Sequence, residues 1–136
     1  MPKNDKRNEI IRIFRKFART GLDFEMLSPM QIYKKIDVLC VSRRSRLDML
    51  SVYDTLRLLW LDGETEIIDA IRNVYFEGKA YRLTKYDIGA RVLALAQKNH
   101  CDERTIYRRL ERARAIYEKV REREGLITDS PFEQYR

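Results

Sequence analysis

Glycine, proline and cysteine are all scarce in this chain of 136 residues, which contains 5, 3 and 2 of them respectively. So few turn-forming residues favour long helices over many short strands. Cys40 and Cys101 stand far apart and form no CxxC pair, so we expect neither a disulfide framework nor a zinc site. The only histidine, His100, has no partner at ligand spacing, and we expect neither a metal nor a cofactor.

Long apolar runs and catalytic motifs are missing as well. No stretch approaches the roughly 18 apolar residues that suggest a membrane-spanning helix, and the basic start leads into an amphipathic segment, unlike a signal peptide. The sequence therefore predicts a protein of the reducing cytoplasm with no membrane partner. It contains no glycine-rich phosphate loop, metal cluster or nucleophile–base pair, so we expect no enzymatic activity.

Positive charge, by contrast, is abundant and unevenly placed. The formal net charge is +7, with seven basic and two acidic side chains in residues 1–20 and twelve basic and seven acidic in residues 80–124. Residues 51–79 have the opposite balance, with three basic and six acidic side chains. Two basic segments around an acidic middle indicate a polyanionic partner such as a nucleic acid.

Apolar residues recur at three- and four-residue spacing along most of the chain, which predicts an all-α protein of five to six helices with a C-terminal helix-turn-helix. The sequence divides into a helical region for scaffolding or dimerisation (1–63), a helix-turn-helix region (64–124) and a flexible tail (125–136). The expected helices cover about 5–20, 29–41, 45–61, 64–76, 85–99 and 103–124.

Two features of the first region allow more than one interpretation. The first helix carries Arg12, Arg15, Lys16 and Arg19 opposite its apolar stripe, which suits a solvated basic face or a second phosphate-touching element. Residues 42–46 form a short basic joint. The helix that follows is apolar on more than one side, so Trp60 and the leucines around it belong either to the core or to a homodimer face.

The helix-turn-helix is predicted from two helix starts and the short joint between them. Thr84 is an N-cap with Asp87 three positions later, and Asp102 is a second N-cap after the break at Asn99–Cys101. Two helices joined by so few residues fit the spacing that this motif needs. The residues predicted to face inward are Ile88, Val92, Leu95 and Ala96 on the first helix and Ile106, Leu110, Ala113, Tyr117 and Val120 on the second.

Arginines dominate the outer face of the second helix. In helix-turn-helix proteins the first residues of the recognition helix contact base edges, and arginine can bind guanine with two hydrogen bonds. We therefore assign base contacts to Glu103, Arg104, Thr105 and Arg108. The residues assigned to phosphate contacts are Lys85, Arg91, Tyr107, Arg109 and Arg112. The alternative is a solvated helix whose arginines pair with its own glutamates at i, i+4.

The run Asp102-Glu103-Arg104-Thr105-Ile106-Tyr107-Arg108-Arg109-Leu110-Glu111-Arg112-Ala113 resembles the recognition helix in the fourth region of bacterial sigma factors. It is equally similar to phage-encoded regulators of the ArpU-like type. The resemblance covers about 50 residues, from Glu64 to Ala113. It departs from the family in a longer first helix of the motif and in His100-Cys101 where a turn glycine is typical. Because the first 60 residues do not resemble the part of a sigma factor that grips the polymerase, the resemblance implies a small phage or prophage regulator.

The sequence thus predicts a sequence-specific regulator of transcription that binds double-stranded DNA. Two alternatives remain at this stage. One is a phage packaging or replication adaptor that binds DNA, and the other is a protein-interaction module whose basic helices contact an acidic partner such as RNA polymerase. A homodimer is compatible with each of them.

Overall fold

The computed structural model describes residues 3–128, and over this range the chain is all-α, with six α-helices, one π-helix and no strand. The prediction of an all-α chain is therefore confirmed for these residues. The elements are α1 (Lys3–Arg19), α2 (Pro29–Leu39), α3 (Arg43–Leu61), α4 (Thr65–Ala70), η1 (Ile71–Phe76), α5 (Lys85–Lys98) and α6 (Glu103–Thr128).

Serine caps fix the starts of α2 and α3. The Ser28 side chain accepts a hydrogen bond from the backbone N–H of Gln31, whose own side chain accepts one from the backbone N–H of Ser28, a reciprocal capping box. Ser42 accepts a hydrogen bond from the backbone N–H of Ser45 at 3.1 Å. The basic joint predicted over 42–46 is therefore wrong, because all but its first residue belong to α3.

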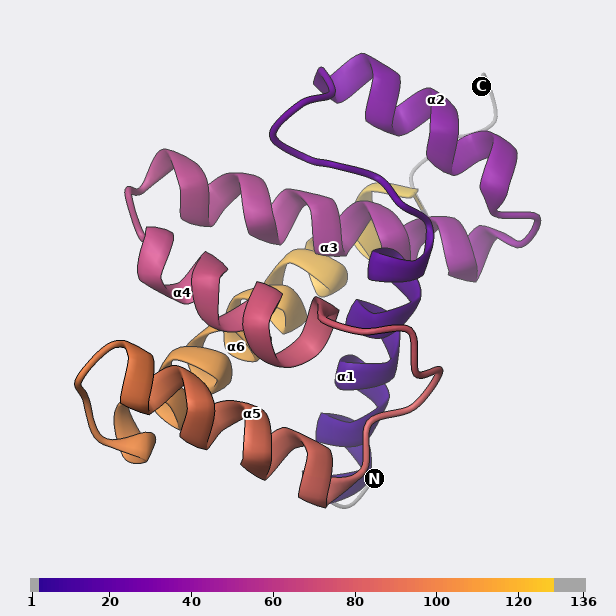
Figure 1. Cartoon of the computed structure of the whole chain (residues 1–136). Coiled ribbons are helices and arrows are strands. Elements are labelled where there is room, and N and C mark those ends of the chain that lie inside the picture. Colours follow the sequence, from indigo (N-terminus) through magenta and orange to yellow (C-terminus); the bar gives the residue numbers. More distant parts are fainter. Residues whose placement is uncertain (1–2, 129–136) are drawn as a thin grey trace.

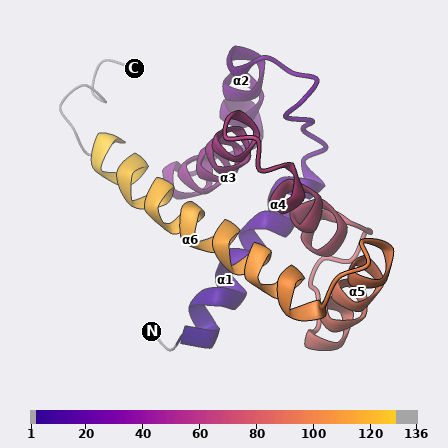
Figure 2. The same ribbon diagram turned by 90° about the vertical axis from the view of Figure 1, so that its left-hand side faces the viewer.

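α6 is the longest of the described helices. It packs against α3, α4 and α5, while α1 packs against α3 and η1, and α2 lies outermost on α3 (Figures 1 and 2). The five residues of α6 that were predicted to face inward are all buried. Phe14 of α1 joins the elements in the middle of the core, since its ring lies edge-on to Tyr75 and Tyr117 at centroid distances of 5.7 and 5.5 Å.

One hydrophobic cluster runs across the predicted boundary at residue 63. It includes buried side chains of α1, α2 and α3 together with those of α4, η1, α5 and α6. The C-terminal boundary also differs from the expectation, because α6 continues through Gly125 to Thr128. The rest of the predicted tail, residues 129–136, lies outside the described residues. Among the helices described, none combines the length and the apolar character that crossing a membrane requires.

Arg15 is the largest departure from the predicted pattern of α1. It was expected on a basic outer face, but its side chain is only 1% exposed. Its Nη1 atom donates to the carbonyl oxygens of Tyr75 (3.0 Å) and Glu77 (2.9 Å), and its Nη2 atom donates to those of Gly78 (3.3 Å) and Ala80. The cation thus satisfies carbonyls at and just beyond the C-terminal end of η1, where a positive charge is favourable.

Arg15 and Arg91 together bind the last turn of η1 and the residues that follow it. Arg91 of α5 donates from Nη1 to the carbonyl oxygen of Val74 at 2.9 Å. Both guanidinium groups therefore bind the same stretch of backbone, one from α1 and the other from α5. This stretch precedes the N-cap of α5, so the two arginines tie the approach to that helix to α1 and to α5 itself.

Candidate nucleic-acid interface

Helix α5 is capped at both ends, and a compact turn joins it to α6. At the start of α5, Thr84 and Asp87 exchange side-chain and backbone hydrogen bonds of 3.0 and 2.9 Å, as the sequence predicted. At its end, the N–H of His100 donates to Gln97 O (3.3 Å) and the N–H of Cys101 donates to Ala96 O (3.0 Å). These two bonds form a Schellman motif, in which the chain reverses through one left-handed residue.

His100 is that left-handed residue, with φ of 54°. Glycine adopts this conformation without a steric penalty, whereas a side chain with a Cβ atom is strained there. His100 therefore occupies the place where glycine is usual in such a turn. Asp102 immediately precedes α6, and its Oδ1 atom accepts a hydrogen bond from the backbone N–H of Arg104 at 2.9 Å.

The two helices cross, and the chain from Thr84 to Val120 is not one continuous rod. In Figure 2, α6 runs across the view while α5 is seen nearly end-on. Helix α5 packs against both α6 and η1, and α4 packs against α6. Three segments next to one another in the sequence, α4–η1, α5 and α6, thus pack in pairs, and α5 braces the N-terminal part of α6 from one side.

The residues assigned to base contacts lie on the surface at the start of α6. Glu103, Arg104 and Arg108 are exposed, and Thr105 is half-buried. No ion pair joins Arg104 or Arg108 to a carboxylate among residues 4–125. Internal pairing with glutamates, the alternative considered from the sequence, is therefore not found for these two arginines.

The residues assigned to phosphate contacts divide into two groups. Lys85, Tyr107 and Arg112 are exposed, whereas Arg109 is half-buried. Arg91 is also half-buried, and its bond to the Val74 carbonyl gives it a structural role that the sequence did not reveal.

Lys85 and Tyr107 line a common groove of about 630 Å³ between the first half of α1, the start of α5 and α6. We call it the basic groove, after its six basic residues Arg7, Arg12, Arg15, Arg82, Lys85 and Arg114. No local pattern indicates this groove, because residues 4–15, Tyr75, residues 82–88 and residues 107–114 come together only in the folded chain.

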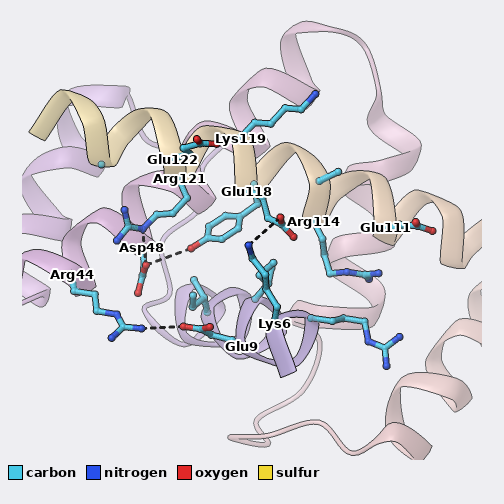
Figure 3. A pocket seen from close by; sticks show the side chains of 16 residues that line it. Lys6, Glu9, Arg44, Asp48, Glu111, Arg114, Glu118, Lys119, Arg121 and Glu122 are labelled. Carbon is cyan, nitrogen blue, oxygen red and sulfur yellow. Dashed lines mark hydrogen bonds and ion pairs between the residues drawn. The ribbon is translucent and has the colours of Figure 1, made fainter. Parts of the chain in front are cut away.

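A second, larger groove of about 1250 Å³ lies between α1, α3 and α6 (Figure 3). Three ion pairs join six of its eleven charged side chains: Lys6–Glu118 at 3.5 Å, Arg44–Glu9 at 3.0 Å and Arg121–Asp48 at 2.9 Å. The Tyr117 hydroxyl also donates to Asp48 at 3.5 Å, and burial together with the Asp48 charge raises the pKa of Tyr117. We call this the mixed-charge groove, because six basic and five acidic side chains line it.

Two carboxyl groups meet where the last turns of α6 pass α3. Asp54 and Glu124 share a side-chain hydrogen bond. Burial, this hydrogen bond and the nearby Glu124 charge raise the pKa of Asp54 to about 7, while Arg57 and Arg123 oppose the shift. The sequence alone gave no sign of this contact, because the two residues are seventy positions apart.

The described residues offer no constellation for metal chemistry: within residues 3–128, no three His, Cys, Asp or Glu side chains lie where they could hold a metal ion. Comparison of the chain with protein-family models, with curated proteins and with solved structures finds no match.

Proposed function

We propose that this chain is a sequence-specific DNA-binding regulator of transcription and that the N-terminal half of α6 enters the major groove of double-stranded DNA. The observation that carries the proposal is the row Arg104, Arg108 and Arg112, exposed at four-residue spacing on a capped helix and unpaired with carboxylates among residues 4–125. An α-helix fits the major groove, and arginine is its commonest specific contact, to guanine.

The dimensions of this row suit the DNA. Residues 104 and 112 are separated by eight steps of about 1.5 Å along the helix axis, or about 12 Å. An α-helix with its side chains is about 10–12 Å across, which matches the roughly 12 Å width of the major groove, so a row of this length can lie along the groove floor. Glu103 stands at the same end and would accept a hydrogen bond from a cytosine amino group, while Thr105 suits a thymine methyl group.

The packing of α5 supports the same function. A recognition helix needs a neighbour that holds it away from the body of the protein while its own N-terminus points at the bases. Here α5 crosses α6 after a four-residue connection and anchors it through Val92, Leu95 and Ala96, which are buried. The helix-turn-helix, its likeness to sigma factors and a phage or prophage origin all form part of this proposal.

The decisive experiment measures binding of purified protein to labelled DNA duplexes by fluorescence anisotropy. With random duplex, affinity should fall steeply with salt, because each neutralised phosphate contributes about 0.9 to the slope of log affinity against log salt. After selection of a preferred site from a random pool, Arg104→Ala and Arg108→Ala should each lose roughly 1–3 kcal/mol of discrimination at one base pair.

Two further variants separate base contacts from phosphate contacts. Arg112→Ala should weaken binding to all sequences alike and lower the salt slope by about 1. Lys119→Ala is the matched control, since it removes one exposed positive charge from the C-terminal half of the same helix and should change neither quantity. A salt-independent affinity, or equal losses from all four variants, would contradict the proposal.

A further inference from the structure

The basic groove carries charge that the protein does not neutralise. Six basic residues line it, against one acidic residue, Asp5. Arg7, Arg12, Arg82 and Lys85 are exposed, and none of them forms an ion pair with a carboxylate among residues 4–125. The repulsion between these cations remains uncompensated, so the groove is a place of high positive potential.

The mixed-charge groove provides an internal comparison. It is also lined by six basic residues, but five acidic ones accompany them, and three ion pairs link its walls. The mixed-charge groove thus has nearly as many carboxylates as cations, whereas the basic groove has a single carboxylate. A general excess of basic residues does not explain this difference.

The inner wall of the basic groove also has hydrogen-bonding capacity to spare. The Nε atom of Arg15 is buried without a hydrogen-bond partner, although the rest of this guanidinium is bonded. Tyr75 accepts a hydrogen bond from Arg114 Nη1 at 2.7 Å, and no acceptor for its own hydroxyl proton is found among residues 4–125. Burial, and to a lesser extent the positive charges of Arg91 and Arg19 outside the groove, lower the pKa of Arg15.

We propose that the basic groove binds a phosphate-bearing anion. Guanidinium groups form strong, charge-assisted and often bidentate hydrogen bonds with phosphate oxygens. The volume of about 630 Å³ lies in the range of pockets that hold small organic ligands. Ile11, Leu83 and Ile88 line part of the groove and provide apolar contact for the organic portion of such a ligand.

Two sources can supply this phosphate. One is a soluble compound such as a nucleotide or pyrophosphate, which would make the groove an effector site. The other is the backbone of a bound duplex, because Lys85 and Tyr107 belong both to the groove and to the candidate DNA interface. The binding chemistry is the same in both cases, and the inference does not depend on the proposed function.

The primary test is calorimetric titration of the full chain with pyrophosphate at constant ionic strength, with sulfate as a control anion. The variant Arg12→Ala/Arg82→Ala removes two exposed charges from the groove. Lys34→Ala/Lys35→Ala removes two exposed charges from α2, outside either groove. We expect at least tenfold weaker pyrophosphate binding in the first variant and wild-type binding in the second, with unchanged circular dichroism in both.

Failure of wild-type protein to bind pyrophosphate, or equal binding by the two double variants, overturns the inference. When binding is found, saturating pyrophosphate is added to a titration of random duplex. Weaker duplex binding assigns the groove to the DNA backbone, and unchanged duplex binding assigns it to a soluble anion. Pyrophosphate binding without any duplex binding would overturn the proposed function alone, whereas duplex binding without pyrophosphate binding would overturn this inference alone.

Discussion

The variant Arg15→Ala should lower the free energy of unfolding, because one side chain donates several hydrogen bonds. Replacing it by alanine leaves the carbonyl oxygens of Tyr75, Glu77, Gly78 and Ala80 without their donor. Hydrogen bonds to a charged group contribute roughly 1.5–3 kcal/mol each, and a buried group left unpaired costs about 1–3 kcal/mol. Because only the Tyr75 contact is fully buried, we expect a total loss of about 3–5 kcal/mol, as for breaking a buried ion pair.

Such a loss is large beside the roughly 5–15 kcal/mol that stabilises an ordinary domain. The assay is urea unfolding followed by far-ultraviolet circular dichroism, in which a lower midpoint at constant slope reports lost stability. Arg12→Ala is the control, since Arg12 is exposed on the same helix and should change stability by no more than about 0.5 kcal/mol.

Two further substitutions separate the causes of the loss. Arg15→Met keeps much of the side-chain volume but removes every donor, so it should be nearly as destabilising as alanine. Arg15→Lys keeps the charge but cannot reproduce the planar, five-donor geometry of the guanidinium, and it should fall between wild type and alanine. If Arg15→Ala were as stable as Arg12→Ala, or Arg15→Met as stable as wild type, the role given to these hydrogen bonds would be refuted.

Three other predictions concern the turns and one carboxyl group. His100→Gly should stabilise the chain by about 0.5–1 kcal/mol and His100→Val should destabilise it, because residue 100 is left-handed; their melting temperatures should differ in that order. Gly78→Ala should lower the unfolding midpoint more than Gly21→Ala, since both have positive φ but only at residue 78 would a Cβ atom meet a side chain, 2.9 Å from Arg91 Nη2. The folded-state pKa of Asp54, about 7, is above its ordinary value of 3.8, so wild-type stability should fall as pH rises from about 4 to 7. After discounting for solvent screening, we expect this loss to be about 1–2 kcal/mol; urea midpoints at pH 5 and 8 should show it in wild type and not in Asp54→Asn.

Local signals predicted most of the helices. The N-cap at Thr84 and the inward stripe of α6 depend on residues within a few positions of one another, so the sequence contains all the information they need. The split of the predicted helix 64–76 into α4 and the π-helix η1 was not foreseen. A π-helical turn depends on how its neighbours pack, and apolar spacing does not encode it.

The burial of Arg15 was not predicted, because its charge suggested a position on the surface. Ile11 and Ala18 lie about one turn before and after it, on the same side of α1, and Ile11 is buried. This spacing was the sign in the sequence that residue 15 faces inward. A basic side chain was nevertheless assigned to the surface, because charged residues are rarely buried without a partner. Its partners are backbone carbonyls sixty or more positions away, which no local pattern could indicate.

The candidate site was predictable only in part. Exposure of Arg104 and Arg108 followed from the buried stripe of their own helix. The tether between Arg91 and Val74 and the assembly of the basic groove depend instead on the packing of separate elements. Local periodicity indicates which face of a helix is outward, whereas tertiary packing decides which outward residues meet.

The length of α6 has a mechanical consequence. Its 26 residues span about 39 Å without interruption, so the arginine row at one end and the contacts with α3 at the other end belong to a single stiff lever. A ligand or partner that shifts α3 would tilt the arginines as well, with no hinge in between to absorb the displacement.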